Sequence, residues 1–570
     1  MGRSMLLVAC AFTLLLASVV SSSVVEHTLV VKNRMLRRLC YEQEVTVVNG
    51  SMPGPVIRVR DGDTLIVHVL NQSPINISLH WHGLFQRRSG WADGAAYITQ
   101  CPLVPGSNYT YKFNITDQQG TLWWHEHRDL SRATIYGAFI IHPRHGKSYP
   151  FPKPDKEVPI LFGEWWNASI TDVDNQGFLT GLGPNLSDAL TINGKPGDLY
   201  PCPKKDTFKL KVKPDNVYLL RLVNAAVNTQ LFFKIANHNL TVVAVDASYT
   251  EPYSTDVVVS GPGQTVDVLL IANKPPKSYY MAIQAYSSSV AAFVNTTATA
   301  IMEYEGGPTT SSIPPELPLL PPFNDTPTAY KFYSNLTSPL RQVSNLPLQV
   351  DERLFITIGM SISPCGLGGN ATCGGPNGTR FSANMNGLSF QVPTKLSILQ
   401  AAFSGSNQNQ GVFTADFPSQ PLVTFDYTNP NNTLNQTLMF SQKSTSVKKI
   451  PFNSSVEMVF QNTAVLGVEN HPIHLHGYDF YVLAMGFGNY NHIQDVSKFN
   501  LFNPQMRNTV AVPAGGWAVI RFRADNPGAW IMHCHLETHL SWGLATALIV
   551  EEGPTPFYKL PPPPSDYPQC

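Results

Sequence analysis

The tripeptide His533-Cys534-His535 constrains the fold of this 570-residue chain more than any other feature. In an extended strand successive side chains point to opposite faces, so the two histidines would face one way and the cysteine the other. One strand could then serve two metal sites back to back. A thiolate with two imidazoles is the ligand set of a blue-copper site, and Cys534 and His539 supply two of those three ligands. The sequence therefore predicts a metal-bearing strand near the C-terminus.

Paired histidines recur in three other segments. These are His80-Trp81-His82-Gly83, Trp124-His125-Glu126-His127 and His471-Pro472-Ile473-His474-Leu475-His476-Gly477. With His539, which follows the tripeptide, these four motifs hold ten of the 16 histidines. One such pair is weak evidence, because scattered histidines often produce it, but four pairs with a cysteine inside one of them indicate clustered metal ligands.

The composition indicates an all-β protein with several domains. Lys+Arg and Asp+Glu both number 39, so no overall charge attracts nucleic acid or an anionic membrane. Charged residues make up only 14%, whereas Gly (40) and Pro (46) are plentiful, which is typical of strands joined by many turns.

The N-terminus predicts secretion. Residues 1–23 combine a basic start, a short apolar run and a small-residue exit, as in a signal peptide; a signal anchor is the alternative. No second apolar run is long enough to span a membrane, so we expect a mature form without membrane segments. Glycosylation acceptors of the N-x-S/T type recur, among them Asn49, Asn76, Asn108, Asn167, Asn185, Asn239, Asn295, Asn335, Asn377 and Asn453. We therefore expect an N-glycosylated extracellular protein.

The chain contains an internal repeat. His125 lies 20 residues after Pro105, and His533 lies 20 residues after Pro513. The same step from Pro262 reaches Ala282, which is no ligand. This register predicts metal in a first domain (24–150) and a third (346–570), with a ligand-free second domain (151–305) and a Pro-rich linker (306–345) between them.

The four motifs, written HWHG, WHxH, HPxHLHG and HCHxxxHxxxGL, resemble in this order those of multicopper oxidases, most closely the plant laccases. The resemblance covers essentially the whole mature chain. It implies three cupredoxin-like Greek-key β-barrel domains and four copper ions, one of type 1, one of type 2 and two of type 3. The type 2 copper would take His80 and His474. One type 3 copper would take His82, His125 and His535, the other His127, His476 and His533. The type 1 copper would take His471, Cys534 and His539.

The resemblance also implies a function. We expect a secreted laccase of the apoplast or cell wall, monomeric and without a nucleic-acid partner, that takes single electrons from phenols such as lignin precursors or flavonoids and reduces O2 to water. Electrons would enter at His539 and Cys534. Leu544, ten residues after Cys534, occupies the axial position, where ascorbate oxidases carry Met, and this favours laccase. The alternatives are an ascorbate oxidase or ferroxidase, or a non-catalytic cell-wall glycoprotein, against which the complete ligand set argues.

Two carboxylates are candidates for proton handling. The family places an aspartate like Asp93 beside the type 2 copper as a catalytic proton source; an Asp-Gly turn is the alternative. Glu126 departs from the family, which usually has Ala there. In the repeat register it stands where Cys534 stands, so we expect it to be buried and paired, with Arg128 first and Arg132 second, as a structural ion pair rather than a proton carrier.

Six cysteines remain after Cys10, which lies in the signal, and Cys534, and they allow fifteen pairings. The family resemblance implies Cys40 with Cys202, Cys101 with Cys570 and Cys365 with Cys373.

Overall fold

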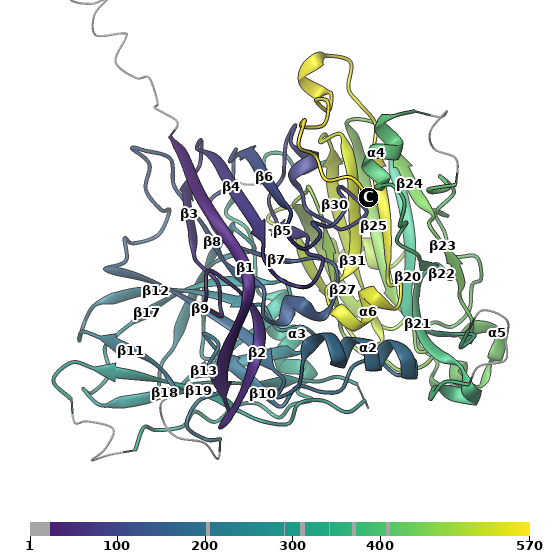
Figure 1. The fold of residues 1–570 in the computed structure, drawn as a ribbon. Helices are drawn as coiled ribbons and strands as arrows, with labels where there is room; N and C mark the ends of the chain where they lie inside the picture. The colour runs from purple at the N-terminus through teal and green to yellow at the C-terminus, as the bar shows by residue number, and fades with distance from the viewer. Residues whose placement is uncertain are drawn as a thin grey trace, which may run out of the picture.

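A computed structural model describes residues 23–200, 206–289, 291–307, 314–340, 343–366, 372–405 and 411–570. The predicted signal peptide lies outside these residues up to position 22. Within the described residues the strands form six sheets, two in each of three successive units, which confirms the all-β prediction. Figure 1 shows the first unit in purple and dark blue, the second mainly in teal and the third in green and yellow. We call the units the first, second and third barrel.

The first barrel consists of two four-stranded sheets. In sheet order, one contains β2 (Tyr41–Val48), β1 (Val24–Arg38), β4 (Thr64–Asn71) and β6 (Asn108–Asn114), and the other β3 (Ile57–Arg60), β8 (Tyr136–His142), β7 (Gly120–Glu126) and β5 (Leu79–His82).

The second barrel has a six-stranded and a five-stranded sheet. The larger contains β10 (Ala189–Ile192), β9 (Lys156–Trp165), β12 (Val217–Asn224), β17 (Thr265–Ile271), β14 (Leu240–Val245) and β15 (Ser248–Thr255). The smaller contains β11 (Phe208–Val212), β19 (Ala298–Tyr304), β18 (Ser278–Tyr286), β13 (Gln230–Ile235) and β16 (Val258–Ser260).

The third barrel has an eight-stranded and a five-stranded sheet. The larger contains β23 (Gln442–Ser444), β22 (Leu388–Phe390), β21 (Arg380–Met385), β20 (Glu352–Ser363), β25 (Ser454–Asn462), β30 (Gly516–Ala524), β27 (Phe480–Phe487) and β28 (Gln505–Arg507). The smaller contains β24 (Val447–Ile450), β32 (Ala545–Val550), β31 (Gly528–Cys534), β26 (His471–Leu475) and β29 (Thr509–Val512).

The three barrels repeat one strand arrangement. The first strand of each pairs in parallel with a later one, as β1 with β4, β9 with β12 and β20 with β25. In the second sheets, β7, β18 and β31 occupy equivalent places. Their cross-strand pairs are His125 with His80, Ala282 with Lys234, and His533 with His474. The 20-residue register read from the sequence is therefore confirmed strand by strand.

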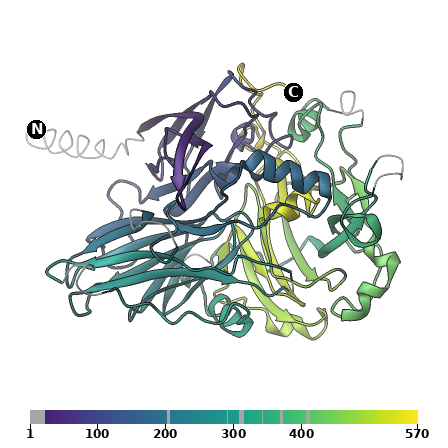
Figure 2. The same ribbon diagram turned by 60° about the horizontal axis from the view of Figure 1, so that its bottom comes forward.

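Helices lie between the strands of the second and third barrels, and α3 lies in the chain between these two barrels. They are α2 (Ile170–Thr180), α3 (Thr326–Ser334), α4 (Ile398–Phe403), α5 (Gln436–Met439) and α6 (Glu537–Ser541). Backbone hydrogen bonds join the end of α2 to the third barrel, from Gly374 N–H to the Thr180 carbonyl and from Phe381 N–H to the Gly181 carbonyl. Figures 1 and 2 show α2 extending from the second barrel toward α6. None of the helices in the described ranges is long and apolar enough to cross a membrane.

The Pro-rich segment predicted as a linker contains α3, and this helix packs. Its Ala329, Phe332 and Tyr333 are buried in the core of the second barrel. Residues 326–334 of this segment therefore pack on the core of the second barrel, and the exact domain boundaries stay predictions.

Two predicted disulfides are formed, Cys101 with Cys570 and Cys365 with Cys373. The third predicted bridge needs Cys202, which lies outside the described residues.

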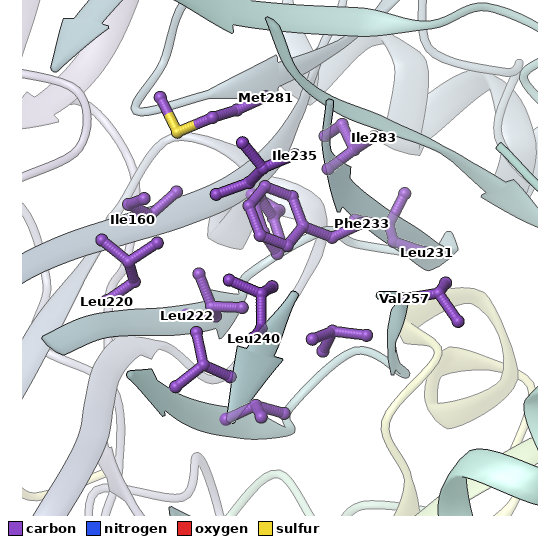
Figure 3. Packing of buried hydrophobic residues seen from close by; sticks show 14 of the residues in the cluster. Ile160, Leu220, Leu222, Leu231, Phe233, Ile235, Leu240, Val257, Met281 and Ile283 are labelled. Carbon is purple, nitrogen blue, oxygen red and sulfur yellow. The ribbon is translucent and has the colours of Figure 1, made fainter. Parts of the chain in front are cut away.

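Alternating apolar residues on both sheets fill the core of the second barrel. Phe233 on β13 is 1% exposed and lies among Leu220, Leu222, Ile235 and Ile283, as Figure 3 shows. Such packing at the density of a protein interior makes the loss of a large side chain costly, because the space left behind is only partly refilled.

We predict that Phe233→Ala lowers the free energy of unfolding by about 3–5 kcal/mol, since it removes buried area and leaves a cavity. The control is Phe502→Ala, because Phe502 is 71% exposed and its loss should change stability by no more than about 0.5 kcal/mol. Urea unfolding followed by circular dichroism compares the two. Equal losses for both variants would contradict the packing described here.

Candidate metal centre

Eight histidines from the first and third barrels meet across the interface between them. They are His80, His82, His125, His127, His474, His476, His533 and His535, each at most 7% exposed. Nε2 of His127 lies 3.3 Å from Nε2 of His533, and Nε2 of His535 lies 3.1 Å from Nδ1 of His82. Two imidazole pairs therefore bridge the barrels.

A second cluster lies on the other face of β31. The Cys534 thiol sulfur is 3.7 Å from Nδ1 of His471 and 3.6 Å from Nδ1 of His539, and all three residues are buried. Strand alternation thus separates Cys534 from its neighbours His533 and His535, as the sequence predicted.

The ligand atoms form four compact groups, each within 4.8 Å. Two coincide with predicted sets, namely His127 with His476 and His533, and His471 with Cys534 and His539. In the other two, His80 lies with His474 and His476, and also with His82 and His125. Ten of the eleven predicted metal ligands lie in these groups, and His535 joins the cluster through its contact with His82. The division of the histidines among individual ions stays a prediction.

Hydrogen bonds fix the tautomers of several rings. Nδ1 of His80 donates to the Asp93 carbonyl (2.7 Å), that of His125 to the Glu126 carbonyl (2.6 Å), and that of His474 to the Asn508 carbonyl (2.8 Å). In all three rings Nε2 is buried and has no hydrogen-bond partner among the described residues. An imidazole held by Nδ1 with a free Nε2 lone pair is a typical metal ligand, so these residues fit a metal.

Burial keeps the rings neutral. It lowers the pKa of His82, His125, His127, His476, His533 and His535 well below the ordinary value, and that of His471 and His474 to about 3. Neighbouring imidazoles add to this shift, because charging one opposes charging the next. Neutral rings are the form that binds a metal ion.

His539 is held differently. Its Nδ1 faces the Cys534 sulfur, and its Nε2 lies 3.1 Å from a carboxylate oxygen of Glu469. Burial alone would lower the pKa of His539, but Glu469 and Cys534 outweigh it and raise that pKa. Sequence reasoning missed Glu469, which stands two residues before the HPxHLHG motif.

Asp93 contacts the cluster directly. Its side chain is fully buried and accepts a hydrogen bond from Nδ1 of His476 at 3.0 Å, while its other oxygen is 3.4 Å from Nδ1 of His80. Thr99 also donates to it at 3.4 Å. The aspartate predicted as a proton source therefore orients two candidate ligands.

Asn508 and Thr509 also orient ligands and were not predicted. The Asn508 amide oxygen and the Thr509 hydroxyl lie 3.2 and 3.3 Å from Nε2 of His82, which leaves Nδ1 of that ring toward His535. Neither residue belongs to a histidine motif, and no spacing in the sequence marks them.

The predicted arginine partners of Glu126 are wrong. Glu126 is fully buried, as expected, but its carboxylate accepts the backbone N–H groups of Arg128 (2.9 Å) and Asp129 (3.1 Å). Strand β7 ends at Glu126, so the strand parity that placed the Arg128 side chain beside it no longer holds. Burial, reinforced by Asp129, raises the pKa of Glu126 well above its ordinary value.

Arg132, the second predicted partner, bonds elsewhere. Its Nε lies 3.4 Å from a Glu537 oxygen, and its Nη1 donates to Nδ1 of His535 at 2.6 Å. In the tautomer that accepts this bond, Nε2 of His535 carries the ring proton. To serve as a metal ligand, that nitrogen would have to give up its proton.

A cleft of about 560 Å³ leads to the cluster. It lies between the barrels and α2, and its lining includes His127, Asp129, Glu537 and Trp542. One histidine of the cluster is thus reachable from the surface.

We predict that Glu126 supports structure rather than chemistry. Glu126→Ala leaves two N–H groups without their acceptor and should lower the free energy of unfolding by about 1–3 kcal/mol. Glu126→Gln retains an amide oxygen and should lose less. Both variants should keep their copper content and their rate of reoxidation by O2 in single-turnover measurements. A tenfold slower reoxidation of both variants at full copper occupancy would instead identify Glu126 as a proton carrier.

Comparison with known proteins identifies the family. Three profiles described as multicopper oxidase match residues 30–146, 156–307 and 416–554. The chain is 55% identical to Laccase-7 of Arabidopsis thaliana, over 99% of both proteins, and 50% identical to Laccase-24 of Oryza sativa subsp. japonica, over 100% of both. The crystal structure of the laccase from Botrytis aclada superposes with a TM-score of 0.70 at 27% identity, covering 93% of this chain and 88% of that one. The chain belongs to the multicopper oxidase family.

Proposed function

We propose that this protein is a laccase that oxidises phenols by single electrons and reduces O2 to water. The observation that carries the proposal is Cys534, which contacts His471 and His539 on one face of β31 while its neighbours His533 and His535 join the histidine cluster on the other. The half-identical relatives named laccase support it.

Four copper ions would be held by the predicted ligands. His471, Cys534 and His539 would hold the type 1 ion, His80 and His474 the type 2 ion, and the other six histidines the type 3 pair. When bound, copper would supply one-electron redox chemistry, with one electron stored at the first site and three at the second, which together make the four that reduction of O2 to water takes. The protein residues supply ligand orientation, electron connection and protons.

His539 is the proposed point of electron entry. Nδ1 is directed at the thiol, so the Nε2 edge faces outward to Glu469, whose side chain is 25% exposed. A phenol that reaches this edge is separated from Cys534 by one imidazole ring. The Glu469 carboxylate fixes the proton on Nε2 and so keeps the Nδ1 lone pair available.

The backbone links the two sites. Cys534 is covalently joined to His533 and His535, and Nδ1 of His533 also lies 2.9 Å from the Cys534 carbonyl oxygen. Both connections are short and buried. Electrons collected at the thiolate would need no diffusing carrier to reach the histidine cluster.

Asp93 is the proposed proton source for oxygen reduction. Its buried carboxyl group contacts His476 and His80. The cleft lined by His127 would let water reach the same cluster. The Asp93 carboxylate would orient His476 and His80 and pass on protons taken from water.

Leu544 supports laccase over ascorbate oxidase chemistry. Its side chain is fully buried in the same core cluster as Cys534, and its carbonyl accepts the Cys534 N–H at 3.0 Å. The residue is held beside the thiol and offers no donor atom. A type 1 site without an axial ligand should have a high potential.

The protein would act outside the cell as a single chain. A secreted, N-glycosylated monomer of the apoplast, acting on lignin precursors or flavonoids, agrees with the signal-like N-terminus and the glycosylation acceptors.

We predict that Cys534→Ser abolishes the absorption band near 600 nm (about the value for a thiolate–copper site) and the oxidation of phenols, because serine cannot supply a soft thiolate. Met532→Leu, a volume-conserving change two residues earlier in β31, is the control and should retain both. Visible spectra and phenol oxidation rates are compared. A blue Cys534→Ser protein would refute the type 1 assignment.

Leu544→Met should lower the type 1 potential, because a thioether ligand stabilises Cu(II) more than Cu(I). Leu548→Met, at another buried leucine of the same core, should leave the potential unchanged. Redox titration of the visible band measures both. An unchanged or raised potential in Leu544→Met would show that Leu544 is not axial.

A further inference from the structure

A cavity of about 280 Å³ lies between α3 and the third barrel, and none of the predicted copper ligands is among its lining residues. Its lining includes Tyr333 of α3, Val482 and Met485 of β27, Gln505 and Arg507 of β28, and Ala511 of β29. Most of the wall is apolar or aromatic, and Arg507 is the buried charged residue in it.

One nitrogen of the Arg507 guanidinium has no hydrogen-bond acceptor among the described residues. Arg507 is 4% exposed, and its Nε donates to a carboxylate oxygen of Asp246 at 3.0 Å. Its Nη2 is buried and has no hydrogen-bond partner in the part of the chain that the structure describes. A buried guanidinium nitrogen without an acceptor is costly, so an acceptor at this position would be stabilising.

The Asp246 carboxylate accepts hydrogen bonds from other groups besides Arg507. It also accepts the backbone N–H of Thr265 at 2.9 Å and that of Thr509 at 3.3 Å. Among the lining residues that the structure describes, none is Asp or Glu, and the charge of Lys498 at the rim is paired with Asp495 at 2.7 Å. The unpartnered Nη2 donor of Arg507 therefore favours a ligand group that accepts a charge-assisted hydrogen bond, such as a carboxylate.

Gln505 adds a second polar group. It lies two residues before Arg507 in β28, hence on the same face of the strand. The residue is 4% exposed, and its side-chain oxygen also lacks a partner within the described ranges. One end of the cavity is thus polar, whereas Val482, Met485 and Ala511 make the rest apolar.

We propose that this cavity binds a small monocarboxylate with an apolar body, such as an aryl carboxylate. The carboxylate accepts a charge-assisted hydrogen bond from Arg507, and the apolar part packs on Val482 and Met485. The volume is at the lower end of ligand pockets, which limits the ligand to about one ring.

A chain of hydrogen bonds connects the cavity to the histidine cluster. Asp246 joins Arg507 to the Thr509 backbone, and the Thr509 hydroxyl lies 3.1 Å from Nδ1 of His474. Val510 and Ala511, which line the cavity, pair with Ile473 and Pro472 of β26.

Calorimetric titration of the copper-loaded protein with benzoate tests the proposal. Benzoate carries no hydroxyl group to be oxidised, so binding is measured without turnover. We expect one saturable site, and at least tenfold weaker binding of benzamide, which has the same shape without the charge. No binding of benzoate, or equal binding of benzamide, would overturn the proposal.

Variants locate the site. Arg507→Gln should weaken benzoate binding at least tenfold, and Ala484→Leu, which fills the cavity from β27 and leaves the Asp246 ion pair intact, should do the same. Lys498→Gln, at the exposed rim, is the control and should bind within threefold of the parent protein. If Ala484→Leu bound benzoate as tightly as the parent protein, the anion would occupy another place, such as a copper ion, and the assignment would fall.

Discussion

The pairing of β26 with β31 determines where the candidate ligands on these two strands point. Hydrogen bonding in this register sets His474 opposite His533 and Ile473 opposite Cys534. Because side chains alternate along a strand, a slip of one residue would turn Cys534 into the histidine cluster and His533 away from it. The register of β26 with β31 therefore keeps the Cys534 site and the histidine cluster separate, although their ligands are adjacent in the sequence.

The cluster also depends on how buried polar groups are satisfied. Eight imidazoles taken out of water would be costly if each lost its hydrogen bonds. In three of these rings, Nδ1 donates a hydrogen bond to a backbone carbonyl, that of Asp93, Glu126 or Asn508. The Nε2 atom of each ring is left for a metal. The same contacts therefore stabilise the fold and select the ligand atom. Both barrels contribute, so their interface is part of the site.

Local patterns predicted a large part of this structure. The histidine pairs, their strand setting and the 20-residue repeat depend on spacing along one strand, and spacing is visible in a sequence. The partner of Glu126 was predicted wrongly because parity was carried past residue 126, where β7 ends and a turn begins. Asn508, Thr509 and Glu469 act through contacts with distant or neighbouring strands that no motif marks. Helix α3 was missed because prolines before it suggested an open linker, whereas its buried face follows them.

The bridge between Cys101 and Cys570 spans 469 residues and joins the first barrel to the tail that follows the third. It closes one covalent ring that contains the last strands of the first barrel, the second barrel and the whole of the third. A single proteolytic cut anywhere within that ring leaves the two halves tethered rather than free to diffuse apart. If the first and third barrels separate transiently, the tether keeps them at a high effective concentration and favours their return. After a transient opening or a cut in the chain, the two barrels that form the histidine cluster would therefore reassociate rather than drift apart.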